Sequence, residues 1–259
     1  MTAPEPRETR HYDTAHVGRV VLYFDQLDST NTAAALLAPR HGPGLVVVAD
    51  HQTAGRGQYG RVWQARPGSS LLMSVALKPP PELCRPVILT ALAAVAVGDA
   101  VQALTGVQAR VKWPNDLLAR GKKVCGILIE NTTATVVGLG LNLSQTAEEF
   151  AAAGLPDATS LGLLAECPVS PDMAAEVVIR KLDAEYDRLL RGERVGVEAD
   201  WKWRVGLLGR AVAVELTDGT TVRGRLREMS FDRLELETRD SRTRLLVPET
   251  VRHVTAESV

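Results

Sequence analysis

The chain has 259 residues, of which 45% are hydrophobic and 24% are charged, and its formal net charge is −1. This composition is typical of a soluble globular protein and excludes a disordered, collagen-like or disulfide-rich chain. The length favours one large domain and one small one. Because 30 Lys plus Arg balance 31 Asp plus Glu, tight generic binding to DNA or to acidic membranes is not expected.

Cysteine usage and the N-terminal composition predict a cytoplasmic protein. The three cysteines, Cys84, Cys125 and Cys167, are far apart and form no CxxC pair, so neither a zinc site nor a disulfide framework is indicated. The first residues lack the apolar segment of a signal peptide. The apolar run over Val87–Val97 is too short to span a bilayer.

The first half of the chain alternates strands and helices after a short mobile leader over residues 1–18. The expected elements are a strand at 20–24, a helix from Asp28–Asn31 to Leu37, a strand at 45–50, a Gly/Arg-rich loop at 52–70 and a strand at 71–77. A nearly apolar helix is expected from Pro86 to about Leu104, and it should be buried.

The second half adds three strands, a helix and a region of different character. Strands are expected at 108–113, 124–130 and 135–143, and a helix at 171–190 with one face formed by Val178, Leu182, Tyr186 and Leu189. From about Arg210 the chain becomes short alternating strands, and Asp218-Gly219 indicates a tight hairpin. We therefore predict an α+β protein with a leader (1–18), a mixed-sheet domain with helices (19–208) and a small SH3-like β-barrel (209–259).

The loop Gly55-Arg56-Gly57-Gln58-Tyr59-Gly60 matches the GxGxxG pattern of dinucleotide-binding proteins. That pattern requires a helix at the last glycine and an acidic residue about 20 positions later, and both are missing here. Glycines allow close approach to an anion, and Arg56 and Arg61 offer paired donors to a carboxylate or phosphate. An anion-binding loop and a solvated surface hairpin therefore both remain open.

The segment Lys112-Trp113-Pro114-Asn115-Asp116 combines a cation, an aromatic ring, a rigid corner, an amide and a carboxylate. These groups suit a nucleoside triphosphate with Mg²⁺, although a surface turn after a strand would use the same residue types. Lys122 and Lys123 begin the next strand, where a lysine reaches either into a cleft or out to water. Only six lysines occur in the chain, and three of them lie between 112 and 123.

Together these segments resemble the biotin protein ligases. The resemblance covers about residues 20–145 and rests on five pieces in the family's order: Asp28-Ser29-Thr30-Asn31, Gln52 to Arg61, Lys112 to Asp116, Lys123 with Gly126, and Gly138-Leu139-Gly140-Leu141-Asn142. The β-rich C-terminal region resembles the family's SH3-like domain. The family activates biotin with ATP and Mg²⁺ to biotinyl-5′-AMP, and then transfers biotin to a lysine of a biotin carboxyl carrier domain.

The resemblance also implies roles for individual residues. Lys123, Arg56 and Lys112 are the implied catalytic residues. The implied biotin site is formed by Ser29, Thr30, Asn31, Gln52, Gly55, Arg56, Gly57, Gln58, Lys123 and Gly126. The implied ATP site is formed by Arg56, Arg61, Trp63, Lys112, Asn115 and Asn142, and Asn115 with Asp116 would hold Mg²⁺.

Two departures from the family's pattern bear on function. Many bacterial members have a second arginine where this chain has Gln58, so part of the grip on the adenylate phosphate is missing. Repressor members carry an N-terminal helix-turn-helix domain, for which about 18 residues before the first strand leave no room. We therefore expect no DNA-binding role, while a homodimer joined through sheet edges is compatible with the resemblance.

Two alternatives compete with a biotin ligase. A lipoate–protein ligase shares the fold and the adenylate chemistry, but Ser29, Thr30 and Gln52 favour a ureido ring over a dithiolane. A non-catalytic sensor of biotin or nucleotide would not need the lysine at 123.

Overall fold

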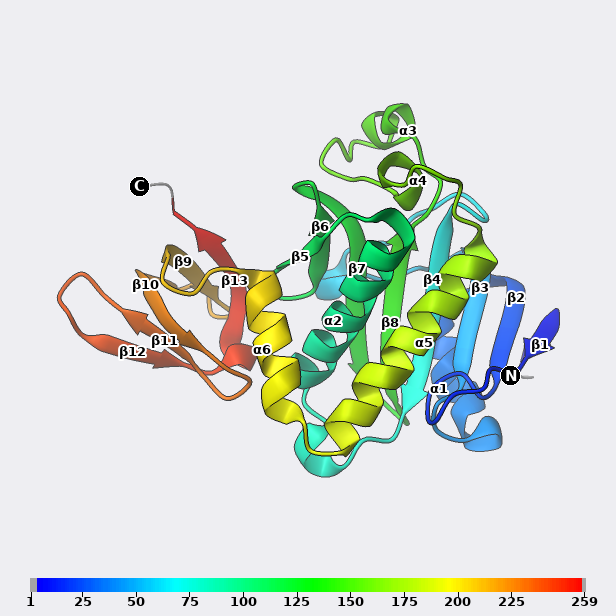
Figure 1. Ribbon diagram of the computed structural model, residues 1–259, viewed down its shortest axis with the longest axis horizontal. Helices are drawn as coiled ribbons and strands as arrows, with labels where there is room; N and C mark the ends of the chain where they lie inside the picture. Colours follow the sequence, from blue (N-terminus) through cyan, green and yellow to red (C-terminus); the bar gives the residue numbers. More distant parts are fainter. Residues whose placement is uncertain (1–3, 258–259) are drawn as a thin grey trace.

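Two β-sheets organise the chain in the computed structural model, which describes residues 4–257. The first is a mixed eight-stranded sheet with the order β1-β2-β3-β4-β8-β7-β6-β5, and the second is a five-stranded antiparallel sheet with the order β12-β11-β10-β9-β13 (Figure 1). This arrangement agrees with the α+β class predicted from the sequence, with a C-terminal all-β part.

The strands of the first sheet are β1 (Glu8–Arg10), β2 (Val21–Leu27), β3 (Val46–Gln52), β4 (Ser70–Leu77), β5 (Ala109–Lys112), β6 (Asp116–Ala119), β7 (Lys122–Asn131) and β8 (Thr135–Asn142). The strands of the second sheet are β9 (Ala211–Leu216), β10 (Thr221–Met229), β11 (Leu234–Glu237), β12 (Thr243–Leu246) and β13 (Val251–Ala256). The helices are α1 (Thr30–His41), α2 (Pro86–Thr105), α3 (Ala147–Ala152), α4 (Leu161–Leu164), α5 (Pro171–Leu190) and α6 (Arg194–Val205).

Helices cover both faces of the first sheet. Helix α1 connects the parallel strands β2 and β3 and packs on one face, while α2 and α5 pack on the other (Figure 1). A crossover helix is the usual way to join parallel strands, since a hairpin cannot connect them. Helix α1 packs mainly on β3, β4 and β8, so other segments cover the β7 side of this face.

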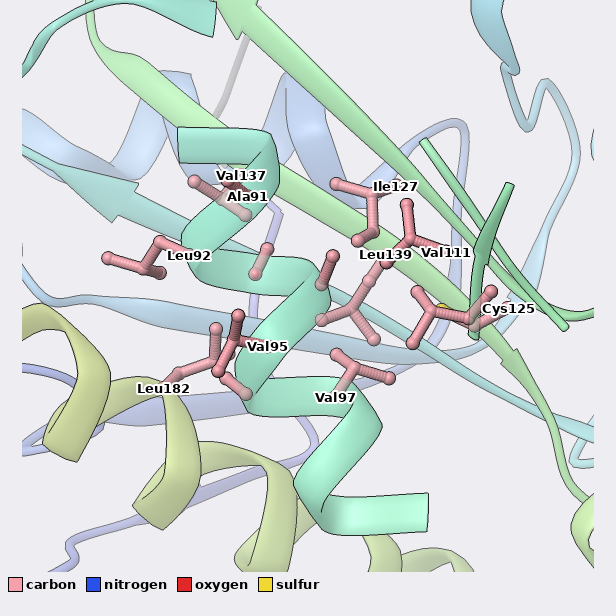
Figure 2. Close-up of a cluster of buried hydrophobic side chains, with 14 of the residues drawn as sticks. Ala91, Leu92, Val95, Val97, Val111, Cys125, Ile127, Val137, Leu139 and Leu182 are labelled. Carbon is pink, nitrogen blue, oxygen red and sulfur yellow. The ribbon is translucent and has the colours of Figure 1, made fainter. Parts of the chain in front are cut away.

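Helix α2 is the centre of the larger core. Its residues Ala91, Leu92, Val95 and Val97 lie among apolar side chains of the sheet and Leu182 of α5 (Figure 2). The helix is long and apolar enough to cross a membrane, but 72% of its most apolar window is buried inside the protein. Its hydrophobicity is therefore explained by burial between the sheet and α5, as expected for a core helix.

The N-terminal segment differs from the mobile leader expected over residues 1–18. Glu8–Arg10 pair with β2 as an edge strand, and Asp183 of α5 accepts hydrogen bonds from the backbone N–H groups of Ala15, His16 and Val17. A three-residue strand carries no periodic signal of its own, so its pairing depends on contacts distant in sequence. Residues 1–3 lie outside the described part of the chain.

The second sheet contacts the first part of the molecule through an aromatic cluster. The ring of Trp201 in α6 lies 5.6 Å from that of Trp113 and 5.4 Å from that of Phe231, measured between centroids. The indole Nε1 of Trp113 donates a hydrogen bond to the carbonyl oxygen of Val251 at 3.1 Å. Arg85 adds partly exposed ion pairs with Asp232 and Glu249, so a buried aromatic cluster and surface charges join the C-terminal part to the rest of the chain.

Candidate active site

One cavity of about 1090 Å³ contains nearly all of the site residues predicted from the sequence. It lies between the loop 53–69, the start of α1, the surface of β7 and β8, and the segment 144–158. Gly55 is the one predicted site residue that does not line it. A side chain at Gly55 would collide with the carbonyl oxygen of Trp63, so this glycine is required for the path of the loop.

Buried polar side chains form one end of the cavity. Ser29, Thr30 and Asn31 are each at most 5% exposed. The Oε1 atom of Gln52 accepts hydrogen bonds from the backbone N–H of Thr30 at 2.7 Å and from its hydroxyl at 3.1 Å. A ligand that reaches this end meets a fixed set of donors and acceptors, which favours a polar ring over an apolar one. Ser74 contacts both Thr30 and Asn31 here, and the sequence pattern did not single it out.

Glycines on β7 and β8 make room for larger side chains. A Cβ atom at Gly140 would lie 2.5 Å from the indole of Trp63, and one at Gly126 would lie 3.1 Å from it. At Gly138 a Cβ atom would collide with the amide of Asn31. The indole of Trp63 therefore lies against a flat floor of strand backbone, where it offers a ring face for stacking.

Two charged groups meet beside this floor. The Nζ atom of Lys123 lies 2.6 Å from the carboxylate of Asp116 and 5.6 Å from the ring centroid of Trp63. Asn115 holds the β5–β6 hairpin against β7, because its Nδ2 donates to the carbonyl oxygen of Ile127 at 2.7 Å. Strand β6 was not expected from the sequence, yet its pairing with β7 is what brings its first residue, Asp116, close to Lys123.

The loop arginine Arg56 is already paired with a carboxylate from β7. Its Nε and Nη2 atoms donate to Glu130 at 3.2 and 3.0 Å, and Asn31 donates to the same carboxylate at 2.7 Å. Burial raises the pKa of Glu130, but the hydrogen bonds from Arg56 and Asn31 outweigh it and hold this pKa below its ordinary value. Glu130 is therefore a carboxylate at neutral pH.

Other polar residues remain at the cavity mouth. Arg61 and Lys112 are exposed cavity residues that form no ion pair within residues 4–257, so both are available to an anion. Gln58 lines the same region and brings no charge. An excess of unpaired positive charge at one mouth favours a polyanionic ligand such as a nucleoside triphosphate.

The segment after β8 covers the far end of the cavity, which the sequence pattern did not indicate. The backbone of Lys123 donates to Asp157 at 2.7 Å and accepts from Thr159 at 2.8 Å. Asn142 donates from Nδ2 to the carbonyl oxygen of Thr159 at 3.0 Å. The Asn142 side chain therefore lines the cavity and also connects β8 to this covering segment. At the same end, Arg66 forms an ion pair with Glu149 of α3.

The protein's own donors suit Mg²⁺ only together with a bound nucleotide. Within the described residues no group of three or more His, Cys, Asp or Glu side chains is placed to hold a metal. The Asp116 carboxylate and the Oδ1 atom of Asn115 are hard oxygen donors at the cavity, and Mg²⁺ usually combines one or two such groups with phosphates and water. The donor set therefore fits a metal carried in with phosphates.

Comparisons with known proteins identify relatives of this chain. Residues 23–142 match the model of the biotin/lipoate A/B protein ligase family. The bifunctional ligase/repressor BirA of Bacillus subtilis is 41% identical over 144 residues, which cover 53% of this chain and 44% of that protein. The chain therefore spans less than half the length of this relative.

A second relative is matched over more of its length. The biotin–[acetyl-CoA-carboxylase] ligase of Mycobacterium tuberculosis is 38% identical over 194 residues, covering 72% of this chain and 70% of that protein. Among solved structures, the biotin protein ligase of Aquifex aeolicus in complex with biotin and ATP superposes with a TM-score of 0.74 at 22% identity. The superposition covers 92% of this chain and 99% of that one, and it establishes the shared fold. From these matches, the chain belongs to the biotin protein ligase family.

Proposed function

We propose that this protein activates biotin with ATP and transfers it to a lysine of a biotin carboxyl carrier domain. The observation that carries the proposal is the single cavity that joins a buried polar end at Thr30 and Gln52 to the cations Arg56, Lys112 and Lys123. The relatives named above as biotin ligases, and the solved complex with biotin and ATP, support the same substrates.

The reaction would proceed in two steps. A carboxylate oxygen of biotin attacks the α-phosphorus of ATP, and pyrophosphate leaves. The amine of an acceptor lysine then attacks the acyl carbon, loses a proton, and AMP leaves. The first step brings two anions together, so nearby cations have to offset their repulsion and the charge that develops at phosphorus.

The site suggests how the residues divide this work. Ser29, Thr30 and Gln52 would bind the ureido ring, while Lys123 would bridge the biotin carboxylate and the α-phosphate. Arg56 would bind the activated carboxylate, with Gly57 allowing close backbone approach. Asn31 supports this end through Ser74 and Glu130.

The nucleotide would occupy the other half of the cavity. Arg61 and Lys112 would bind its outer phosphates, and Trp63 and Asn142 would contact the adenine. Asn115 and Asp116 would hold Mg²⁺, which, when bound, neutralises phosphate charge. We further propose that the protein acts in the cytoplasm and has no DNA-binding role, in keeping with its near-zero net charge.

The test is a reaction of the full chain with biotin, Mg-ATP and a carrier domain. We expect pyrophosphate release and a gain in mass of the carrier by one biotinyl group. Pyrophosphate release with lipoate but not biotin would replace the proposal with a lipoate–protein ligase. Binding of biotin and ATP without any pyrophosphate release would indicate a sensor instead.

A further inference from the structure

Glu130 lies behind the cavity rather than in it. Its carboxylate, near the end of β7, contacts side chains from the Gly-rich loop and from α1, yet Glu130 does not itself line the cavity. It is 28% exposed at the side chain, and Arg56 is 44% exposed. An isolated pair with this exposure would contribute little to stability, so its position next to the site calls for another explanation.

The geometry of Arg56 supplies one. Two of its hydrogen bonds, from Nε and Nη2, fall on the two oxygens of Glu130, and Nη2 also donates to the hydroxyl of Thr32 at 3.2 Å. A two-point contact between the guanidinium and the carboxylate fixes the plane of the arginine as well as its place. Within residues 4–257 Arg56 donates from Nε and Nη2 only, so Nη1 remains for a ligand.

Glu130 is in turn held by the polar end of the cavity. Asn31 donates to Glu130 at 2.7 Å and accepts from the hydroxyl of Ser74 at 2.6 Å. Ser74 lies 2.7 Å from the hydroxyl of Thr30, whose backbone N–H donates to Gln52 at 2.7 Å. A connected set of hydrogen bonds therefore links the residues proposed to bind the ureido ring to the loop arginine.

We propose that Glu130 is a positioning residue, which holds the Arg56 guanidinium so that Nη1 meets the carboxylate or phosphate that reacts. This role rests on the proposed function, because it assumes an anionic ligand at Arg56. Without the carboxylate, Arg56 still carries its charge but regains several side-chain rotamers, so fewer bound complexes have the reactive geometry. The loss should therefore appear in the rate of adenylate formation more than in biotin affinity.

The test compares Glu130→Gln with the wild-type chain in initial rates of pyrophosphate release over ranges of biotin and ATP. Gln has the same shape but lacks the charge and one acceptor oxygen. We expect kcat to fall about tenfold and the biotin KM to change less than about threefold, as for a misplaced catalytic group. Glu130→Asp, which keeps the charge, should recover part of the rate.

A double-variant cycle separates positioning from a general structural effect. In an Arg56→Ala background, Glu130→Gln should cause no further loss of rate, because the residue through which it acts is absent. Glu249→Gln is the matched control, since Glu249 pairs with Arg85 at 33% and 32% side-chain exposure outside the cavity. Its rates should equal those of the wild type, and melting curves would show that all variants are folded at the assay temperature.

Two results would overturn the role of Glu130 while leaving the proposed function intact. One is an active wild type with an equally active Glu130→Gln variant. The other is that Glu130→Gln lowers the rate of pyrophosphate release by the same factor with and without Arg56. A wild-type chain that releases no pyrophosphate from biotin and ATP would instead overturn the proposed function, and this role with it.

Discussion

Lys123 contributes to the cavity through both its side chain and its backbone. The ammonium lies between the Asp116 carboxylate and the Trp63 ring, and the backbone N–H and C=O bind the covering segment at Asp157 and Thr159. An ammonium on a flexible stem can move from a carboxylate to phosphate oxygens while its backbone stays fixed. Lysine therefore suits this position better than the bulkier, planar arginine.

Replacing Lys123 by Ala should reduce adenylate formation by about 100-fold or more, since the charge proposed to stabilise the reacting phosphate is removed. Pyrophosphate release measures this loss. The matched control is Lys122→Ala, because Lys122 is the exposed neighbour on β7 and does not line the cavity. Equal losses in both variants would show that general charge, rather than the placed ammonium, supports the reaction.

Under the proposed function, Gln58 is expected to bind the reaction intermediate more weakly than an arginine would. It lines the cavity where a second loop arginine would add a charged donor to the adenylate phosphate. We expect Gln58→Arg to slow the release of biotinyl-5′-AMP about tenfold, within the range for a charge-assisted hydrogen bond. Release of the labelled intermediate from wild type and variant measures this directly, and unchanged release would contradict it.

Single residues with distinctive chemistry could be predicted from the sequence, whereas their partners could not. Arg56, Lys112 and Lys123 belong to short motifs that stand out in the sequence, and all three line the cavity. Glu130 and Ser74 lie inside ordinary strand sequences, and they reach the site only through the pairing of β7 with β8 and of β8 with β4. Such partnerships depend on register between distant segments, which a single sequence does not specify.

At the scale of elements, the register of β7 and β8 shapes the floor of the cavity. Gly126 and Gly140 are directly paired across the two strands, and both lie under the indole of Trp63. A one-residue slip would place larger side chains under the ring. The pairing of these two strands therefore determines the position of the Trp63 indole in the cavity.

This floor predicts a graded response to added methyl groups. Gly140→Ala should displace Trp63 and weaken ATP binding strongly, because the new Cβ would lie 2.5 Å from the indole. Gly126→Ala should have a milder effect, since its closest contact is 3.1 Å and a small shift can relieve it. Binding titrations with ATP measure both, and a larger effect at Gly126 would contradict this account.

Most of the long elements were predicted well, and several of the short ones were missed. The helix predicted at 171–190 is α5, and its expected apolar face, Val178 to Leu189, is buried. The four-residue strand β6 and the six-residue helix α3 are too short for a periodic pattern to show. Helix α6 was also missed, since its sequence contains Gly196 and interrupted apolar spacing.

For the whole molecule, ion pairs join the C-terminal sheet to the helices. Asp232 accepts hydrogen bonds from Arg194 and Arg85, and Lys202 of α6 pairs with Glu228. The hydrogen bonds from Arg194 and Arg85 lower the pKa of Asp232. Those from Lys202 and the Met229 backbone lower the pKa of Glu228. Burial raises both pKa values, but the hydrogen bonds outweigh it. Both side chains are therefore charged at neutral pH.

These contacts should weaken in acid. A carboxyl group whose pKa is lowered in the folded state stabilises the fold at any pH above its ordinary pKa, which is 3.8 for Asp232. This stabilisation is lost as the pH falls through the folded-state pKa. At neutral pH the wild type should therefore have a higher melting temperature than Asp232→Asn. The difference in free energy of unfolding should be at most about 1 kcal/mol, because the Asp232 side chain is largely exposed.

The difference between wild type and Asp232→Asn should shrink toward zero as the pH falls below 3.8 and through the lowered folded-state pKa of Asp232. Asp13→Asn serves as the control, since Asp13 is exposed and forms no ion pair with any residue from 4 to 257. Melting temperatures at several pH values provide the measurement. A difference that persists unchanged in acid would mean that Asp232 stabilises the junction by something other than its charge.

Under the proposed function, the backbone hydrogen bonds of Lys123 bear on the order of substrate binding and reaction. The segment that covers the far end of the cavity cannot swing outward without breaking the bonds from Lys123 to Asp157 and Thr159. Entry of a nucleotide by that route would thus leave the backbone of Lys123 held only by the pairing of β7 with β6, and reclosure would restore both bonds. Under the proposed function, Lys123 would be fully held only while the segment is closed, so opening the cavity and reacting in it would be separate events.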